Sequence, residues 1–475
     1  MIAKIIVDNK SKQVDKPFDY LVPKELEGKI KIGSRVLVPF SSGNREIEGF
    51  CVGTADTSDS KRLKSIIRTA NDSIGFDEDM LELIEWMHKK YLASYLDIIH
   101  TIVPSGTALK TKEWIILENK SEEKSEIRRC ITEILTDNGG SMEFKGLKEM
   151  CGVDIQNQVR AMIKEGTLKK EYRQSVDIKD KKIKCVKLIC DRETALESAE
   201  ILRRKAPVQA KMLEVLSENE YVSLADLQKF TNGSHSTVKA LEKKNLVNVF
   251  DMTVERDPYW NRVFEKTEKM VPTPEQEYAI DEITNSVKSG DGGIYLLHGV
   301  TGSGKTEVFM QTIENVINMG KSAIMLVPEI SLTPQMVSRF MSRFGGRVAI
   351  FHSGLSAGER YDQWKKIRDG EADIVIGARS AIFTPLKNIG VIIMDEEHSD
   401  TYKSDMSPRY HARETAIFRA SQFGAAVVLA SATPSVESYY KAQTGEYKLL
   451  EMNTRYNKNK MPEISVIDMR SELEK

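Results

Sequence analysis

The stretch "YLLHGVTGSGKTEVFMQTI", residues 295–313, joins an apolar run to a helical pattern through a glycine-rich loop. Its centre, Gly299–Thr306, fits the pattern G-x-x-x-x-G-K-[ST], which cradles phosphate groups when it lies between a strand and a helix. Glycines let backbone N–H groups curl round phosphate oxygens, and Lys305 can reach the terminal phosphates. The alternative is a glycine-rich structural turn. We expect the nucleotide to be held by Gly299, Val300, Thr301, Gly302, Ser303, Gly304, Lys305 and Thr306.

The sequence around this loop alternates apolar runs with helical segments from Thr273 onward. The runs are "GGIYLLHGV", "KSAIMLVPE", "RVAIFHS", "ADIVIGARS", "GVIIMDEE" and "AAVVLASAT". Near-continuous apolar strands that alternate with helices indicate a parallel sheet covered on both faces. We therefore expect a P-loop (RecA-like) parallel-sheet domain in this part of the chain.

A second strand tip carries the carboxylates that a phosphate-binding loop needs. In "VIIMDEEHSDTYK", residues 391–403, Asp395 is expected to hold Mg²⁺ together with the Thr306 hydroxyl. Glu396 is expected to orient the attacking water. We take Lys305, Thr306, Asp395 and Glu396 as the catalytic set. His398 is expected to sense the nucleotide and relay its state, although a lone histidine is more often structural.

Other strand tips carry "LVPEISLTPQ", "GARSAIFTP" and "SATPS". In this order, together with the phosphate-binding loop and the D-E-E-H box, they resemble lobe 1 of superfamily 2 helicases. The resemblance implies that Arg379 faces the nucleic-acid backbone and that Ser431 and Thr433 couple it to ATP. It also makes Gln276, in the upstream "TPEQ", a reader of the adenine ring.

The segment "SDTYKSDMSPRYHARETA" follows the D-E-E-H box directly. Aromatic and cationic side chains together suit stacking on unpaired bases and holding phosphates. The alternative is a surface loop over a helix start. The residues expected to contact DNA here are Tyr402, Lys403, Arg409, Tyr410 and Arg413.

The N-terminal region has a different texture. Residues 1 to about 70 contain short β-branched runs broken by Gly, Pro and Asn, which predicts a small β-rich unit. In residues 79–104 the apolar positions Leu83, Ile84, Met87, Tyr91 and Leu92 recur at helical spacing, so we expect one helix packed on that sheet.

The middle of the chain contains two similar stretches, "VRAMIKEGTLKKEYRQSVDIKD" from Val159 and "VKALEKKNLVNVFDMTVERD" from Val238. Each predicts a helix, a turn and a strand, which we interpret as two winged-helix-like α+β units. The alternative is that any amphipathic helix followed by a strand would look the same.

Together these motifs resemble the PriA-type replication-restart helicases closely. The N-terminal "FDYLVP" and "GSRVLVPF" resemble the domain of that family that binds the 3′ end of DNA, which implies a pocket containing Phe18, Asp19 and Lys64. Ser41 stands where the family commonly has glycine after V-P-F, so the close backbone approach of the pocket is in question. The implied domains are a 3′-end-binding domain (1–110), winged-helix-like regions (111–200 and 201–258), helicase lobe 1 (259–450) and the start of a linker (451–475).

The resemblance implies an ATP- and Mg²⁺-dependent 3′ to 5′ DNA helicase that recognises stalled forks and starts primosome assembly. Its implied partners are forked DNA with a 3′ end, single-stranded DNA, primosome proteins and single-strand-binding proteins. The family's second lobe, with a zinc module and arginines that complete the ATP site, has no counterpart here. We therefore expect a truncated helicase that binds ATP but hydrolyses it poorly, since an arginine finger contributes about 10³- to 10⁵-fold in related phosphoryl transfer. The alternatives are a non-catalytic fork-binding module and another superfamily 2 translocase.

Composition sets limits on these readings. The 475 residues carry a formal net charge of −1, so DNA contacts must come from local sites and not from a general basic field. Five scattered cysteines without a C-x-x-C pair predict reduced thiols and no zinc site. No apolar run approaches 18 residues and the N-terminus lacks a secretion signal, so we expect a cytoplasmic protein without membrane contact.

Overall fold

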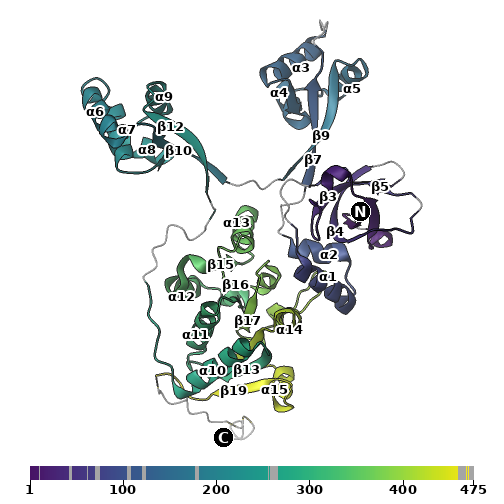
Figure 1. Cartoon of the computed structure of the whole chain (residues 1–475), viewed down its shortest axis with the longest axis vertical. Coiled ribbons are helices and arrows are strands. Elements are labelled where there is room, and N and C mark those ends of the chain that lie inside the picture. The colour runs from purple at the N-terminus through teal and green to yellow at the C-terminus, as the bar shows by residue number, and fades with distance from the viewer. Residues whose placement is uncertain are drawn as a thin grey trace. The chain divides into compact units, whose positions relative to one another are not determined.

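The computed structural model describes residues 1–9, 11–41, 45–60, 62–69, 75–103, 109–119, 125–176, 181–254, 256, 266–457, 467 and 469. The chain divides into two compact units (Figure 1). One contains Met1–Asp177 and Arg262–Lys475, and the other is Ile178–Asn261. Most of the predicted linker at 451–475 lies outside the described residues. The α/β multidomain class expected from the sequence is confirmed.

The C-terminal part of the first unit is built on a seven-stranded sheet in which every neighbouring pair is parallel. The strand order is β15-β16-β14-β17-β18-β13-β19. The strands are β13 (Gly293–Gly299), β14 (Ser322–Leu326), β15 (Val348–Phe351), β16 (Ile374–Gly377), β17 (Ile389–Met394), β18 (Ala426–Ser431) and β19 (Lys448–Met452). The apolar runs that predicted a parallel sheet form six of these strands.

Helices connect and cover these strands. They are α10 (Pro274–Ser289), α11 (Lys305–Asn318), α12 (Pro334–Phe344), α13 (Ala357–Arg368), α14 (Ala412–Phe423) and α15 (Val436–Gln443). All residues of β14, β16, β17 and β18 are buried, as expected for strands covered on both faces. Because the strands are parallel, the loops after β13, β14, β16, β17 and β18 meet at one edge of the sheet.

The N-terminal domain is a six-stranded sheet in the order β5-β2-β1-β4-β3-β6. Its strands are β1 (Ile2–Val7), β2 (Phe18–Leu21), β3 (Arg35–Phe40), β4 (Arg45–Ala55), β5 (Lys64–Ser65) and β6 (Arg68–Thr69). Alternating apolar residues such as Ala3, Ile5, Val36 and Val38 form its core. The β-rich N-terminal region predicted from the sequence is thus confirmed.

The helical pattern after this sheet forms two helices where we expected one. They are α1 (Glu78–Tyr91) and α2 (Tyr95–Ile102). Leu92 ends α1 in a left-handed conformation, with φ of 52°, and its side chain is 90% exposed. Leu83, Ile84 and Met87 are buried as predicted. The apolar periodicity continues through the break because Ser94 caps α2 and keeps Leu96 and Ile99 on a buried face.

Helix α1 lies against helix α14 within the same compact unit. The Trp86 and Phe418 rings stack with centroids 4.6 Å apart. The Tyr91 hydroxyl donates to Glu414 Oε2 at 2.9 Å, and burial raises the pKa of Tyr91 to about 12. Gln422 donates to the backbone oxygen of Asp79 at 2.9 Å. The N-terminal domain therefore contacts the segment that follows the D-E-E-H box.

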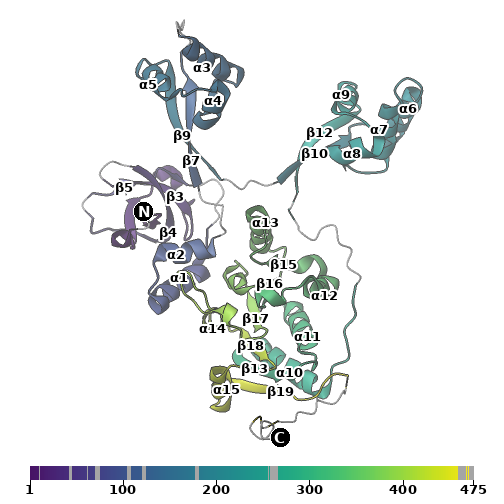
Figure 2. The ribbon, with the colours of Figure 1, turned by 180° about the vertical axis from the view of Figure 1, so that it is seen from behind.

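The middle of the chain contains two small units, each with a three-stranded sheet (Figure 2). The elements of the first are β7 (Leu109–Leu117), α3 (Glu126–Asp137), β8 (Ser141–Glu143), α4 (Phe144–Cys151), α5 (Gln156–Lys164) and β9 (Leu168–Val176). The elements of the second are β10 (Lys181–Leu188), α6 (Arg192–Leu202), α7 (Pro207–Ser217), β11 (Val222–Ser223), α8 (Leu224–Thr231), α9 (His235–Lys243) and β12 (Val247–Val254).

Both helix-turn-strand repeats are present in these units, as α5 followed by β9 and α9 followed by β12. The boundary between these two small units lies before Lys181, and not at residue 200 as expected. Strand β10 pairs with β12 along its whole length, from Lys181 to Leu188, so it belongs to the second unit. A single strand without its partner gives no sign in the sequence of which sheet it joins.

Six short 3-10 helices complete the described elements. They are η1 (Lys12–Val14), η2 (Lys24–Leu26), η3 (Glu329–Ser331), η4 (Gly345–Arg347), η5 (Arg379–Phe383) and η6 (Asp400–Tyr402). The five cysteines are all free. Within the described ranges, no helix is long and apolar enough to cross a membrane, and no cluster of three or more His, Cys, Asp or Glu side chains could hold a metal ion.

Candidate active site

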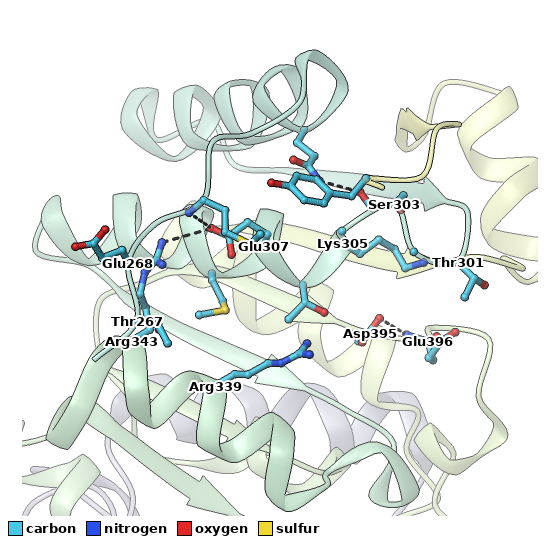
Figure 3. Close-up of a pocket in the computed structure, with 17 residues that line it drawn as sticks. Thr267, Glu268, Thr301, Ser303, Lys305, Glu307, Arg339, Arg343, Asp395 and Glu396 are labelled. Carbon is cyan, nitrogen blue, oxygen red and sulfur yellow. Dashed lines mark hydrogen bonds and ion pairs between the residues drawn. The ribbon is translucent and has the colours of Figure 1, made fainter. Parts of the chain in front are cut away.

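The loop edge of the sheet in the C-terminal domain opens into a cavity of about 590 Å³ (Figure 3). Its walls come from the loop Thr301–Thr306, from Gln276 on α10 and from Asp395 and Glu396 after β17. The structure thus brings together the phosphate-binding loop and the two carboxylates, which lie about ninety residues apart in the sequence.

The loop has the backbone conformation that its glycines predict. Gly302 and Gly304 have φ of 83° and 85°, where other residues are strained. A Cβ at Gly304 would lie 2.3 Å from Gln276 Nε2, so no larger residue fits. Ser303 Oγ is buried and has no hydrogen-bond partner among the described residues. A glycine cradle with a buried, unsatisfied hydroxyl fits a bound phosphate group.

Gln276 supports the loop from the first turn of α10. It is only 1% exposed, and its Nε2 donates to the backbone oxygen of Ser303 at 2.8 Å. Its Oε1 accepts from the backbone nitrogen of Thr273 at 2.8 Å, which completes a capping box. Gln276 lines the cavity, and its proposed role as a reader of adenine stays a prediction.

Lys305 begins α11 and points into the cavity. Its Nζ donates to the backbone oxygen of Gly299 at 2.7 Å. Burial lowers the pKa of Lys305, while the negative charges of Asp395 and Glu396 act in the opposite direction. Among the described residues no carboxylate lies within ion-pair distance of this ammonium group, so an anion in the cavity would stabilise its charge.

Asp395 and Glu396 follow directly after the buried strand β17. Burial, and next the neighbouring charge of Glu396, raise the pKa of Asp395 to about 6. Glu396 takes a left-handed backbone conformation with φ of 46°, and its N–H donates to Asp395 Oδ1 at 3.0 Å. A non-glycine residue in this conformation is uncommon and fixes where the two carboxylates point.

The residues present fit a magnesium ion. The Thr306 hydroxyl and the Asp395 carboxylate line the same cavity, and both are hard oxygen donors of the kind that Mg²⁺ prefers. Asp395 and Glu396 repel each other, so a positive charge beside them is stabilising. Thr306 and Asp395 are therefore the side chains that would hold Mg²⁺ beside a nucleotide phosphate.

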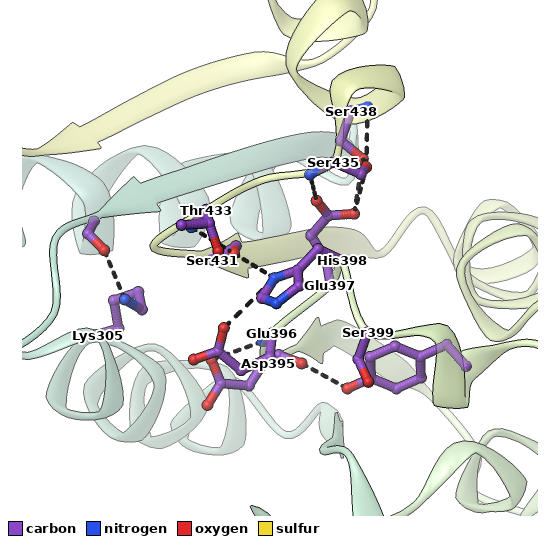
Figure 4. A network of polar contacts seen from close by, with 12 residues as sticks. Lys305, Asp395, Glu396, Glu397, His398, Ser399, Ser431, Thr433, Ser435 and Ser438 are labelled. Atoms are coloured by element: carbon purple, nitrogen blue, oxygen red, sulfur yellow. Dashed lines mark hydrogen bonds and ion pairs between the residues drawn. The ribbon is translucent and has the colours of Figure 1, made fainter. Parts of the chain in front are cut away.

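His398 connects the carboxylates to the tip of strand β18 (Figure 4). Its Nδ1 lies 2.8 Å from Ser431 Oγ and 3.6 Å from Glu396 Oε2. Ser431 Oγ in turn accepts from the backbone nitrogen of Thr433 at 2.9 Å. The three residues expected to couple the two strand tips are thus joined by hydrogen bonds, and His398 also lies within ion-pair distance of Glu396.

No role was predicted from the sequence for Glu397, the third carboxylate of the box. Its side chain is fully buried, accepts from the backbone nitrogen of Ser435 at 2.6 Å and lies 3.1 Å from Arg413 Nη1. Arg413 Nη1 also donates to Ser438 Oγ at 2.8 Å. Figure 4 shows Glu397 pointing away from Asp395 toward the serines of α15. The S-x-x-S spacing in "SATPSVES" was the available signal for this cluster.

The segment after the box is folded into the domain. Tyr402 is fully buried, and its hydroxyl donates to the backbone oxygens of Asp395 at 2.6 Å and of Leu326 at 3.0 Å. Tyr410 is 3% exposed and contacts the Phe383 ring edge-on at 4.8 Å. Neither tyrosine offers a free ring face for a base in this conformation.

The cationic residues of the same segment hold its backbone. Arg379 Nη1 donates to the backbone oxygens of Thr401 and Lys403. Lys403 Nζ donates to the backbone oxygen of Arg409 at 2.7 Å and lies over the Tyr91 ring. The Arg409 side chain is exposed. The predicted contacts of these residues with DNA are not tested by this geometry.

The three residues predicted for the 3′-end pocket lie on neighbouring strands of the N-terminal sheet. Strand β2 carries Phe18 and Asp19 and pairs with β5, which begins at Lys64. Asp19 Oδ2 accepts from Ser58 Oγ, and Lys64 Nζ donates to the backbone oxygen of Ser41 at 2.6 Å. Ser41 has φ of 63°, so it adopts the conformation for which glycine is suited.

Comparisons with known proteins give two domain matches. Residues 4–104 match the family described as the 3′DNA-binding domain (3′BD), and residues 273–442 match the DEAD/DEAH box helicase family. The replication restart protein PriA of Bacillus subtilis is 40% identical over 99% of this chain and 58% of its own length. That of Synechocystis is 32% identical over 99% of this chain and 57% of its own. The chain therefore spans somewhat more than half the length of these relatives.

Among solved structures, RecG bound to a three-way DNA junction is 26% identical, with a TM-score of 0.30, over 41% of this chain and 24% of its own. The two domain matches cover both ends of the described structure, and the curated relatives match it throughout. The chain is thus similar over its whole length to the PriA-type replication restart proteins, and it carries a 3′DNA-binding domain and a DEAD/DEAH box helicase domain.

Proposed function

We propose that this chain binds ATP with Mg²⁺ and that ATP hydrolysis at this cavity drives 3′ to 5′ movement on DNA. The observation that carries the proposal is the cavity in which Lys305, Thr306, Asp395 and Glu396 converge on a glycine cradle. When bound, Mg²⁺ neutralises phosphate charge. Lys305 binds the terminal phosphates, Thr306 and Asp395 hold the ion, and Glu396 orients water for attack.

The ion-pair contact from Glu396 to His398 and the hydrogen bond from His398 to Ser431 support a coupling role. A change in the position of Glu396 that accompanies nucleotide binding would reach the backbone of Thr433 through the side chains of His398 and Ser431. In the helicases that this domain resembles, the loop that corresponds to the one at Ser431 faces nucleic acid. We propose that His398, Ser431 and Thr433 link the nucleotide state to DNA contacts made by the segments around Arg379 and Ser399–Arg413.

We propose that the N-terminal domain receives the 3′ end of a DNA strand at a stalled or repaired fork. Asp19 can accept a hydrogen bond from a terminal 3′-OH or a base edge, but its charge repels a phosphate. Phe18 contacts Phe40 edge-on at 5.5 Å and is half-buried, so one part of its ring is available to a base or sugar. Lys64 completes the predicted pocket.

Fork recognition of this kind would serve replication restart by primosome assembly in the cytoplasm. The partners we propose are forked DNA with a 3′ end, single-stranded DNA, primosome proteins and single-strand-binding proteins. The names of the curated relatives support this role, and the 3′DNA-binding domain match supports the DNA ligand.

The test is steady-state ATP hydrolysis by this chain with forked DNA that ends in a free or a blocked 3′-OH. We expect nucleotide to bind and forked DNA to stimulate its turnover. A Lys305→Ala variant sets the background. Stimulation that survives Lys305→Ala contradicts the assignment of the cavity, and stimulation that ignores the block contradicts the 3′-end pocket. Fork binding with no nucleotide binding would instead favour a non-catalytic fork-binding module.

A further inference from the structure

Helix α12 forms a wall of the nucleotide cavity that no sequence motif marked. Arg339 and Arg343 lie four residues apart on this helix, which places them on one face, and both line the cavity. Figure 3 shows the Arg339 side chain reaching into the cavity from α12, below the loop that carries Lys305. The two arginines differ in what they contact.

Arg343 is an anchor between α12 and the helix that follows the phosphate-binding loop. Its side chain is 5% exposed, and its Nη2 lies 3.4 Å from Glu307 Oε1 and 3.3 Å from Glu314 Oε2. Both glutamates lie on α11, so this pair of contacts holds the face of α12 against α11. The wall is therefore fixed relative to Lys305 and Thr306 at the start of the same helix.

A third segment is tied to the same point. Glu307 Oε1 also accepts from the backbone nitrogen of Met270 at 3.3 Å and from Gln311 Nε2 at 2.8 Å. The backbone nitrogen of Thr267 donates to the oxygen of Ser342 on α12 at 3.3 Å. The segment before α10, the helix α11 and the helix α12 thus share one hydrogen-bonded network around the cavity.

Arg339 lies one turn before Arg343 and is exposed to the cavity. Among the described residues it has no hydrogen bond and no ion pair. By contrast, Arg347 at the end of the same region is 2.7 Å from Asp373. A guanidinium group keeps its charge at all relevant pH values and offers donors in a planar fork that matches phosphate oxygens.

We propose that Arg339 binds phosphate oxygens of the nucleotide held by the phosphate-binding loop, with Arg343 as the residue that positions α12. The inference rests on the proposed function, because it requires a nucleotide in this cavity. It adds a second cation from the same domain, across the cavity from the glycine cradle. Such a contact favours nucleotides with more phosphates, since each phosphate adds negative charge within reach of the guanidinium.

The experiment is equilibrium binding of three probes, MgATPγS, MgADP and AMP, to the purified chain and its variants. We expect Arg339→Ala to raise the Kd for MgATPγS about tenfold or more, that for MgADP less, and that for AMP hardly at all. Arg339→Lys keeps the positive charge but loses the planar fork of donors. We therefore expect its Kd for MgATPγS to lie between those of the unmodified chain and of Arg339→Ala. Arg347→Ala is the matched control and leaves all three values unchanged. The exposed Arg339 side chain can be removed without disturbing the fold, which thermal unfolding verifies.

The outcomes separate this inference from the proposed function. If Lys305→Ala abolishes MgATPγS binding while Arg339→Ala leaves it within twofold of the unmodified chain, the inference is overturned and the proposed function stands. An equal loss for all three probes places Arg339 at the base or ribose and overturns the phosphate contact. If Lys305→Ala binds MgATPγS like the unmodified chain, the proposed function itself fails.

Discussion

The nucleotide cavity and the segment Ser399–Arg413 are neighbours in the sequence and the fold. Their polar side chains differ in whether they have partners within the protein. In the cavity, Lys305 and Asp395 carry charges that burial disfavours, and Ser303 Oγ has no partner among the described residues. In the segment, Tyr402 and Lys403 are hydrogen-bonded within the protein. The polar groups of the cavity are therefore open to a ligand, whereas those of the segment bind other parts of the protein next to the cavity.

Residue type alone therefore does not show what a side chain binds. Aromatic and basic residues in the segment suggest DNA contacts, but most of them hold one another and the backbone after the D-E-E-H box. We propose that such a segment transmits a change in the carboxylates to its exposed residues, such as Arg409. It can act on DNA through a rearrangement, and the following changes test whether its contacts are structural.

The largest effect is expected for Arg413→Ala. Arg413 is the cation next to Glu397, which is fully buried, and its loss leaves a buried carboxylate without a counter-charge. We expect the free energy of unfolding to fall by about 3 kcal/mol, measured by urea denaturation. The serine hydroxyls that also contact Glu397 reduce the loss but do not replace the charge.

A double variant sharpens this prediction. In Arg413→Met with Glu397→Gln, the buried charge is removed together with its partner, and most of the stability should return. If Arg413→Ala leaves the stability unchanged and only weakens binding to single-stranded DNA, Arg413 belongs with the external ligands, and the contrast between the two regions fails at this residue.

The next effect has the opposite sign and lies in the cavity. Burial raises the pKa of Asp395 to about 6, above its ordinary value of 3.8. The folded protein therefore binds the proton more tightly than the unfolded chain, and ionised Asp395 destabilises the fold fully above pH 6 and less as the pH falls toward 3.8. We expect Asp395→Asn to stabilise the ligand-free protein by about 2 kcal/mol at pH 7.5.

The measurement is urea denaturation in the presence of a chelator at pH 7.5 and pH 4.5, with a smaller gain expected at the lower pH. Magnesium-dependent nucleotide binding should weaken in the same variant, because a ligand of the ion is lost. A variant that is less stable than the unmodified chain at both pH values would show that Asp395 is a structural residue and not one held at a cost for its ligand.

A smaller effect is expected for Tyr402→Phe, which removes only the hydroxyl that joins the tips of β14 and β17. Two backbone oxygens, of Leu326 and Asp395, lose a donor inside the domain. We expect a loss of about 1 to 2 kcal/mol in the free energy of unfolding. Tyr440→Phe is a matched control, because the Tyr440 side chain is 66% exposed. Unchanged stability combined with weaker DNA binding would instead assign the Tyr402 hydroxyl to DNA.

The sequence was most informative where one local rule determines the structure. The glycine spacing of residues 299–306 and the apolar runs from Gly293 to Ser431 predicted the cradle and the parallel sheet, because steric limits and burial act on each segment by itself. The carboxylates after β17 followed from the same reasoning. Ser41 has the left-handed conformation that favours glycine, which residue type alone left open.

The sequence was least informative where contacts join distant segments. Glu397 and Ser438 meet only once β17 and α15 are packed, and Arg339 lines the cavity only once α12 is packed against α11. The break at Leu92 was hidden because apolar spacing continues on both sides of it. Periodicity records which faces are buried, but it does not record which element buries them.

The smallest predicted effect concerns His411, at the junction of the segment and helix α1. Burial lowers the pKa of His411, and the positive charges of Arg413 and Lys403 lower it further. The negative charges of Glu414 and Glu397 raise it. Its Nδ1 accepts from the backbone nitrogen of Arg413 at 3.2 Å, which requires the neutral ring. As the pH falls below about 6.5, the unfolded chain binds a proton that the folded chain resists, so this group lowers the stability toward acid pH.

His411→Asn retains an acceptor that caps α14 but does not titrate. We expect the change in stability from pH 7.0 to 5.5 to be more favourable in this variant than in the unmodified chain by about 0.5 kcal/mol, measured by urea denaturation. An unchanged pH dependence would mean that the ring protonates freely and that the junction with α1 opens in solution.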